Sequence, residues 1–173
     1  NNITSPWNIN MIDTGLDTLT GGRCKIISKS IGNETSFLTY GDGLSDINID
    51  KLLKFHKKNQ KLITVSAVHP SARFGELDLD GDRVLAFKEK PQLQRGWING
   101  GFFVVEPGFF NYIDNPNVML EREPIEKATL DSELYAYKHE GFWQCMDTRR
   151  DHELLEILWK DNKAPWAKIS PKK

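Results

Sequence analysis

Cysteine is scarce in this chain, because its 173 residues contain only two, Cys24 and Cys145. The two lie far apart in the sequence and lack the spacing of metal-ligating cysteines. So few thiols exclude a disulfide-dense secreted scaffold, and they fit the reducing environment of a cytoplasm. We therefore expect a cytoplasmic protein.

Long apolar runs and an excess of charge of one sign are also absent. No run approaches the ~20 residues that a membrane helix needs, and no charged-then-apolar signal segment opens the chain. The 23 Lys and Arg residues balance 24 Asp and Glu residues, so the net charge of -1 gives no support for binding nucleic acid or an anionic membrane. Any phosphate site must therefore be local.

Repeats and low-complexity linkers are missing as well, so residues 1–173 are expected to form a single domain. Its 39% of hydrophobic residues suffices for a buried core. The chain begins at Asn1 without a methionine, which indicates a fragment of a longer protein.

The hydrophobic pattern alternates between the periods of strands and of helices, which is typical of an α/β sheet. The expected strands lie at 9–14, 37–42, 62–68, 97–105 and 134–138. The expected helices lie at 23–31, 50–59, 106–113, 123–130 and 149–159, the last with a packing stripe of Leu154, Leu155, Leu158 and Trp159. Residues 76–79 and 83–87 alternate around Asp80-Gly81-Asp82, which predicts an inserted β-hairpin.

The strand at 37–42 runs directly into Asp42, which stands between Gly41 and Gly43. The carboxyl end of a buried strand opens onto the crevice where α/β sheets hold their ligands. Glycines on both sides of a carboxylate allow unusual backbone angles and let a phosphate come close to the main chain. A turn capped by Asp42 is the simpler explanation of an isolated Gly-Asp-Gly, so the motif needs support from the rest of the chain.

A second carboxylate, Asp147, stands between an apolar segment at 142–147 and the last helix. Either Asp147 or Thr148 could cap that helix. Both Asp42 and Asp147 nevertheless fall at expected strand ends, and two carboxylates meeting there would suit Mg²⁺, which takes oxygen ligands, water and substrate phosphates.

Charged residues also close the hairpin, in the segment Lys88-Glu89-Lys90-Pro91. Such a cluster is usually solvated surface. Here Pro91 stiffens the exit, the Lys90 ammonium suits a phosphate, and the Glu89 carboxylate can accept hydrogen bonds from sugar hydroxyls. The pair could recognise a sugar phosphate.

A loop rich in hydroxyls and glycine, 18–23, opens the first helix, with Arg23 in its first turn. Free N–H groups and the helix dipole make such a helix start an anion site. The loop has neither the Walker pattern nor the spacing of a dinucleotide fingerprint, so by itself it is a weak signal.

Together these segments resemble the sugar-1-phosphate nucleotidyltransferases, and most specifically the bacterial glucose-1-phosphate cytidylyltransferases. Gly-Asp-Gly and Glu-Lys-Pro belong to the wider superfamily, whereas Thr-Gly-Gly-Arg, Asn-Gly-Gly-Phe-Phe and Gly-Phe-Trp-Gln point to the cytidylyl branch. The matching segments run nearly end to end, at 6–9, 13–15, 20–23, 39–43, 73–75, 89–91, 98–103, 141–144, 146–148 and 164–166.

The resemblance implies a Rossmann-like α/β fold of the nucleotide-diphospho-sugar transferase type, with a mixed, mostly parallel sheet flanked by helices. It also implies Mg²⁺-dependent transfer from CTP to glucose 1-phosphate, giving CDP-glucose for bacterial surface polysaccharide, by a homo-oligomer. The implied catalytic residues are Asp42, Asp147 and Lys90, the two aspartates being the metal ligands. The implied substrate contacts are Thr18, Arg23, Gly41, Gly75, Glu89, Lys90, Ile98 and Asn99, the first three toward the nucleotide.

One departure from the family is large. Its amino-terminal glycine-rich loop with Gly-Thr-Arg and its Lys-Pro-Lys segment have no counterpart in these 173 residues, so the resemblance implies the carboxyl-terminal portion of the enzyme. Two alternatives stay open at this point. One is the same reaction with UTP or dTTP, and the other is a non-catalytic module that binds a sugar phosphate or supports assembly.

Overall fold

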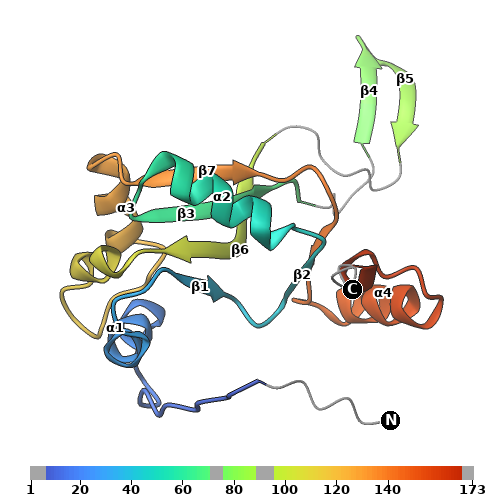
Figure 1. The fold of residues 1–173 in the computed structure, drawn as a ribbon. Helices are drawn as coiled ribbons and strands as arrows, with labels where there is room; N and C mark the ends of the chain where they lie inside the picture. Colours follow the sequence, from blue (N-terminus) through green and yellow to red (C-terminus); the bar gives the residue numbers. More distant parts are fainter. Residues whose placement is uncertain (1–6, 71–75, 89–95, 169–173) are drawn as a thin grey trace.

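The computed structural model describes residues 7–70, 76–88 and 96–168, and a four-stranded mixed sheet lies at its centre (Figure 1). The strands follow the order β1 (Ser36–Thr39), β6 (Ile98–Val105), β3 (Ile63–Val68) and β7 (Leu134–Lys138). The mixed α/β fold is confirmed. Within the described strands, however, β6 runs antiparallel to both neighbours and only β3 and β7 pair in parallel, because the chain reaches β6 from the inserted hairpin.

The helices fall where the periodicity predicts them. They are α1 (Thr20–Ile31), α2 (Ile49–Asn59), α3 (Glu123–Leu130), α4 (Arg149–Lys160) and the short 3₁₀ helices η1 (Pro107–Tyr112) and η2 (Pro165–Lys168). Local caps explain several boundaries. The Asn48 side chain accepts a hydrogen bond from the Lys51 amide at the start of α2, and Gln60 ends that helix in a left-handed conformation.

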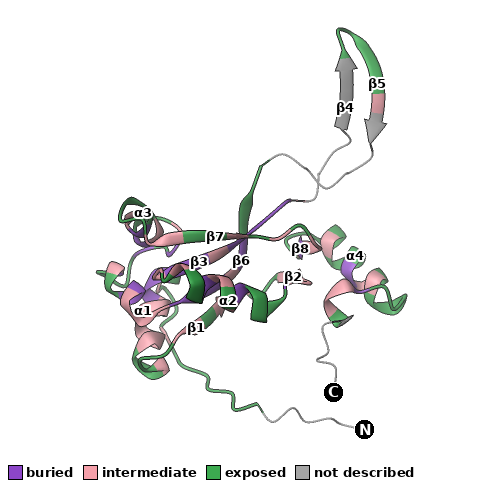
Figure 2. Cartoon of the chain, turned by 45° about the horizontal axis from the view of Figure 1, so that its top comes forward, coloured by how far each residue is buried: buried purple, intermediate pink, exposed green. Residues whose placement is uncertain are grey.

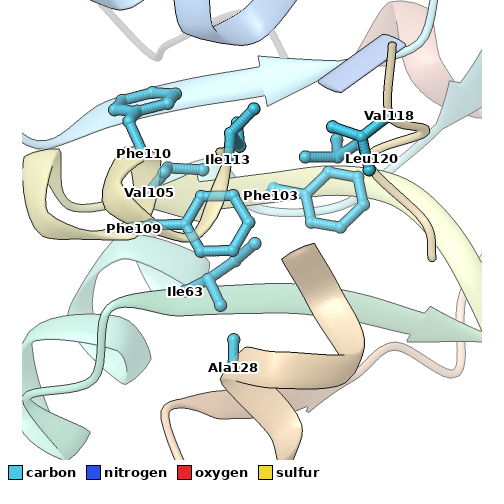
Figure 3. Packing of buried hydrophobic residues seen from close by; sticks show 9 residues of the cluster. All are labelled: Ile63, Phe103, Val105, Phe109, Phe110, Ile113, Val118, Leu120 and Ala128. Atoms are coloured by element: carbon cyan, nitrogen blue, oxygen red, sulfur yellow. The ribbon is translucent and has the colours of Figure 1, made fainter. Parts of the chain in front are cut away.

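Strand β6 divides the core, because its successive side chains point to opposite faces of the sheet. Phe103 and Val105 pack with η1, α3 and the segment before α3, and Figure 3 shows this cluster. Val104 packs on the other side with Leu52 of α2. The sheet is therefore covered on both faces, which holds the ends of β1 and β6 in fixed positions.

Two small antiparallel sheets complete the fold. The predicted hairpin is confirmed as β4 (Glu76–Asp80) and β5 (Arg83–Lys88), and Figure 1 shows it projecting away from the main sheet. Gly81 supplies the positive φ of 57° that its turn requires. The second small sheet pairs β2 (Gly43–Ser45) with β8 (Trp143–Cys145), which joins the segments after Tyr40 and before Asp147.

Two expectations from the sequence are wrong. Residues 9–14 form no strand, and Ile9 and Met11 are 74% and 95% exposed, because no described strand lies beside them to complete a ladder. The packing stripe of α4 is mostly unburied, and Figure 2 shows that only a small part of this helix is buried. Leu155 is buried, whereas Leu154 and Trp159 are 43% and 59% exposed. No helix among the described residues is long and apolar enough to cross a membrane.

Candidate functional site

Gly41-Asp42-Gly43 forms the turn between β1 and β2. The Asp42 carboxylate is exposed, and its backbone carbonyl accepts a hydrogen bond of 2.8 Å from the Met146 amide. Neither Gly41 nor Gly43 has a positive φ. The expectation that these two glycines adopt unusual backbone angles is therefore wrong. A side-chain carbon at Gly41 would meet no atom within 4 Å, which leaves the main chain open to a ligand.

Asp147 follows β8 and is also exposed. It does not cap α4, because Thr148 does so in a capping box with Asp151. The Cys145 thiol donates a hydrogen bond of 3.3 Å to Asp147 Oδ2. Burial, and then this hydrogen bond, raise the pKa of Cys145. Asp147 is thus left to present its carboxylate at the surface.

The backbones of the two aspartates lie near the same end of the β2–β8 ladder. Gly43 lies opposite Cys145, and the next hydrogen bond along the ladder joins Asp42 to Met146, the residue before Asp147. Within the described residues, no group of three or more His, Cys, Asp or Glu side chains could hold a metal ion. A pair of exposed carboxylates fits Mg²⁺, which completes its shell with water and substrate phosphate.

Ile98 and Asn99 lie exposed at the start of β6, in front of the buried pair Gly100 and Gly101. The register of β6 against β3 shifts between Val65 and Ala67, which marks a bulge in this part of the ladder. Asn99 Oδ1 accepts a hydrogen bond of 2.8 Å from the Gly101 amide. Asn99 also contacts Tyr40, to whose hydroxyl oxygen Asn99 Nδ2 donates at 3.2 Å.

The loop before α1 differs from the expected anion site. Gly21 and Gly22 are buried inside the helix, and the Gly21 amide, expected to be free for a phosphate, donates to the Val118 carbonyl at 3.0 Å. Arg23 folds back onto its own loop, since its guanidinium donates to Thr14 Oγ1 at 2.6 Å and to the Leu16 carbonyl at 2.9 Å. Thr18 stays half-buried beside this loop.

Glu121 is a residue that sequence reasoning missed. Its Oε1 accepts a hydrogen bond of 2.6 Å from the Tyr40 hydroxyl, and its Oε2 accepts one of 3.0 Å from Thr20 Oγ1. Burial, and then Glu121, raise the pKa of Tyr40. Glu121 is one of 24 acidic residues and carries no motif or spacing, so nothing in the sequence singles it out.

The charge of Glu121 also affects the pKa of Cys24, which lies on the same helix as Thr20. Burial, and then the Glu121 charge, raise the pKa of Cys24 to about 11 from an ordinary value of 9.0. At pH 8 its thiolate fraction is then about a thousandth instead of about a tenth. We expect iodoacetamide to alkylate Cys24 about a hundredfold more slowly than a free thiol at this pH. The alkylation rate, followed by mass spectrometry, is expected to keep rising through pH 10. A plateau near pH 9 would contradict this.

Three predicted site residues, Gly75, Glu89 and Lys90, lie outside the described residues. The remaining ones come from three places in the fold. Thr18 and Arg23 lie at the start of α1, Gly41 and Asp42 follow β1, and Ile98 and Asn99 begin β6. Asp147 joins the second group through the β2–β8 ladder.

An α/β sheet with paired aspartates beside it is an arrangement suited to phosphate-bearing substrates and a divalent cation. A family model described as nucleotidyl transferase matches residues 20–161, and the chain belongs to this family. A glucose-1-phosphate cytidylyltransferase of Salmonella typhi is 44% identical over 162 residues, which are 93% of this chain and 63% of that protein. A mannose-1-phosphate guanylyltransferase of Mycobacterium tuberculosis is 34% identical over 140 residues, 76% of this chain and 39% of that protein.

Among solved structures, the fold is similar to that of a Bacillus anthracis protein described as a glucose-1-phosphate thymidylyltransferase. The TM-score is 0.61 at 14% identity, over 92% of this chain and 65% of the other. At that identity the likeness concerns the fold alone. The chain spans about 63% of the length of the cytidylyltransferase that it matches.

Proposed function

We propose that the protein takes part in nucleotidyl transfer from CTP to glucose 1-phosphate, giving CDP-glucose and pyrophosphate. The observation that carries the proposal is the 44% identity to a glucose-1-phosphate cytidylyltransferase across 93% of the chain. The guanylyltransferase relative is only 34% identical, over a shorter part of the chain. The comparison therefore favours cytidine over guanosine nucleotides.

The exposed aspartates supply the metal-binding part of the proposed reaction. Asp42 and Asp147, held at one end of the β2–β8 ladder, would bind Mg²⁺. When bound, Mg²⁺ neutralises charge on the triphosphate and the leaving pyrophosphate. The attacking oxygen of a sugar phosphate is already ionised at neutral pH, so the protein needs no general base. Its contribution is to position the two substrates and to balance their charge.

Sugar recognition is proposed for the start of β6 and the hairpin exit. Ile98 and Asn99 are exposed there, and Asn99 contacts Tyr40, which precedes the Gly41 turn that faces the nucleotide in this proposal. From the resemblance to the family, Lys90 is proposed to hold the sugar phosphate, and Glu89 and Gly75 are proposed to surround the sugar. Thr18 and Arg23 are proposed to face the nucleotide, with Arg23 acting at least in part by fixing its own loop.

The nucleotide is tested by incubating the protein with glucose 1-phosphate, Mg²⁺ and CTP, UTP or dTTP in turn, and measuring pyrophosphate release. We expect release with CTP at a rate at least about tenfold above that with either other nucleotide, because discrimination between bases by hydrogen bonds is worth at least that much. A preference for UTP or dTTP would contradict the cytidylyl assignment.

Calorimetry separates the non-catalytic alternative from the enzyme. Glucose 1-phosphate is titrated into the protein, with glucose 6-phosphate as a control that keeps both the sugar and the phosphate but joins them elsewhere. Selective binding of glucose 1-phosphate without pyrophosphate release from any nucleotide would support a sugar-phosphate-binding module. Absence of both binding and release would refute both proposals for this chain.

A further inference from the structure

Glu121 joins three separate segments of the candidate site. Its carboxylate contacts Thr20 at the start of α1 and Tyr40 in front of the Gly41–Asp42 turn, and Tyr40 in turn contacts Asn99 at the start of β6. These three segments are those to which the nucleotide, metal and sugar contacts were assigned. Glu121 itself precedes α3 and is half-buried.

The direction of each hydrogen bond in this chain is fixed by the groups at its two ends. An ionised carboxylate can only accept, so the single proton of the Tyr40 hydroxyl points to Glu121 Oε1, 2.6 Å away. The hydroxyl oxygen is then left to accept from Asn99 Nδ2 at 3.2 Å. At the far end the Gly101 amide can only donate, so it requires Asn99 Oδ1. The Asn99 side chain therefore has one orientation that satisfies both neighbours.

The Tyr40 ring is held as firmly as its hydroxyl. The Tyr40 amide donates to the Gly101 carbonyl at 3.3 Å, and the ring packs edge-on against Phe103 with the ring centres 5.8 Å apart. Gly101 has a φ of 77°, and a side-chain carbon there would lie 2.6 Å from the Tyr40 ring. Because Tyr40 immediately precedes Gly41, a displaced ring would also displace the turn that carries Asp42.

We propose that Glu121 is a positioning residue that orients Asn99 for the sugar phosphate through the Tyr40 hydroxyl. The sugar-binding part of this inference rests on the proposed function. Glu121 touches no substrate in this scheme, and its effect on ligand binding passes through Tyr40.

Affinity for glucose 1-phosphate, measured by calorimetry on the 173-residue chain, tests the proposal. Glu121→Ala and Tyr40→Phe each break the same link, so each is expected to weaken binding about tenfold, as for loss of one oriented hydrogen bond. The double variant is expected to show the same tenfold loss, because the second change has nothing left to break. A hundredfold loss in the double variant would mean independent effects and would overturn the proposal.

Glu121→Gln is the conservative rescue. Its amide oxygen can still accept from Tyr40 while its NH₂ group faces Thr20 Oγ1, so binding is expected to stay within about threefold of the original. An equal loss in Glu121→Gln and Glu121→Ala would assign the effect to charge and overturn the positioning role. Glu126→Ala, a change of the same kind at an exposed residue of α3, is the matched control and should leave affinity unchanged. If Glu121→Ala fails to fold, Tyr40→Phe and Glu121→Gln decide the question.

Nuclear magnetic resonance separates this inference from the proposed function. In the unliganded protein the Asn99 NH₂ signals are expected to be sharp and distinct, and to broaden or exchange faster in Glu121→Ala. Unchanged Asn99 signals would overturn the inference whether or not glucose 1-phosphate binds. If the Asn99 signals change but the original protein binds no glucose 1-phosphate, the link to Asn99 stands and the proposed function fails.

Discussion

Asp147→Asn is expected to lower pyrophosphate release by on the order of a hundredfold to a thousandfold, the range for removing one electrostatic stabiliser from an active site. The substitution keeps the shape of the side chain and removes its charge, so the loss would come from weaker metal binding. Mn²⁺ serves as a direct probe, because its electron paramagnetic resonance signal changes on binding, and its affinity should fall in parallel. The melting temperature should stay the same, since Asp147 is exposed and does not cap α4.

Thr148→Ala, one residue further on, is the matched control with the opposite expected result. The Thr148 hydroxyl accepts a hydrogen bond from the Asp151 amide and so caps α4. Loss of this cap should lower the free energy of unfolding by about 1 kcal/mol. Mn²⁺ affinity should be unchanged. If Asp147→Asn instead lowered stability and left Mn²⁺ binding intact, the role of Asp147 would be structural and the metal proposal would fail.

Local periodicity predicted most of the fold. The hairpin at Asp80-Gly81-Asp82 and the helix at 123–130 were both predicted from patterns that involve neighbouring residues only. The direction of β6 was not, because strand pairing depends on where the chain re-enters the sheet rather than on its own residues. The strand expected at 9–14 failed for a related reason, since a strand requires a partner as well as an alternating sequence.

The candidate site divides in the same way. Asp42 and Asp147 could be picked out because each follows an apolar segment, and the β2–β8 ladder brings their backbones together. Glu121 could not, because its importance comes from contacts with Thr20 and Tyr40, which are 101 and 81 residues away in sequence. Long-range hydrogen bonds of this kind leave no periodic trace in a single sequence.

The glycine pair at the start of α1 has a different role from the one that the sequence indicated. Gly21 and Gly22 belong to the loop at 18–23 that the sequence marked as a weak anion site, yet both are buried in the helix against the segment 116–118. A side-chain carbon at Gly22 would collide with the backbone of Pro116, and one at Gly21 would lie 2.7 Å from the Val118 carbonyl oxygen. The pair therefore allows α1 to lie close to the segment that leads to Glu121.

Gly22→Ala is accordingly expected to destabilise the protein. Alanine favours a helix over glycine by up to about 1 kcal/mol, whereas overpacking against a rigid neighbour costs about 1–3 kcal/mol. Because the neighbour is backbone and cannot rotate away, the collision should dominate, with a net loss of about 2 kcal/mol. Urea denaturation measures this directly, and the melting temperature should fall by about 4–8 °C.

Gly41→Ala is the matched control for stability, because a side-chain carbon at Gly41 would meet no atom and its φ is not positive. It should change the free energy of unfolding by no more than about 0.5 kcal/mol. Equal effects of the two substitutions would mean that α1 does not depend on close packing at Gly22.

If Gly22→Ala is destabilised as expected, α1 shifts away from 116–118, and the Thr20 contact with Glu121 should weaken with it. The Tyr40 hydroxyl then keeps its own bond to Glu121, so glucose 1-phosphate affinity should fall less than in Tyr40→Phe.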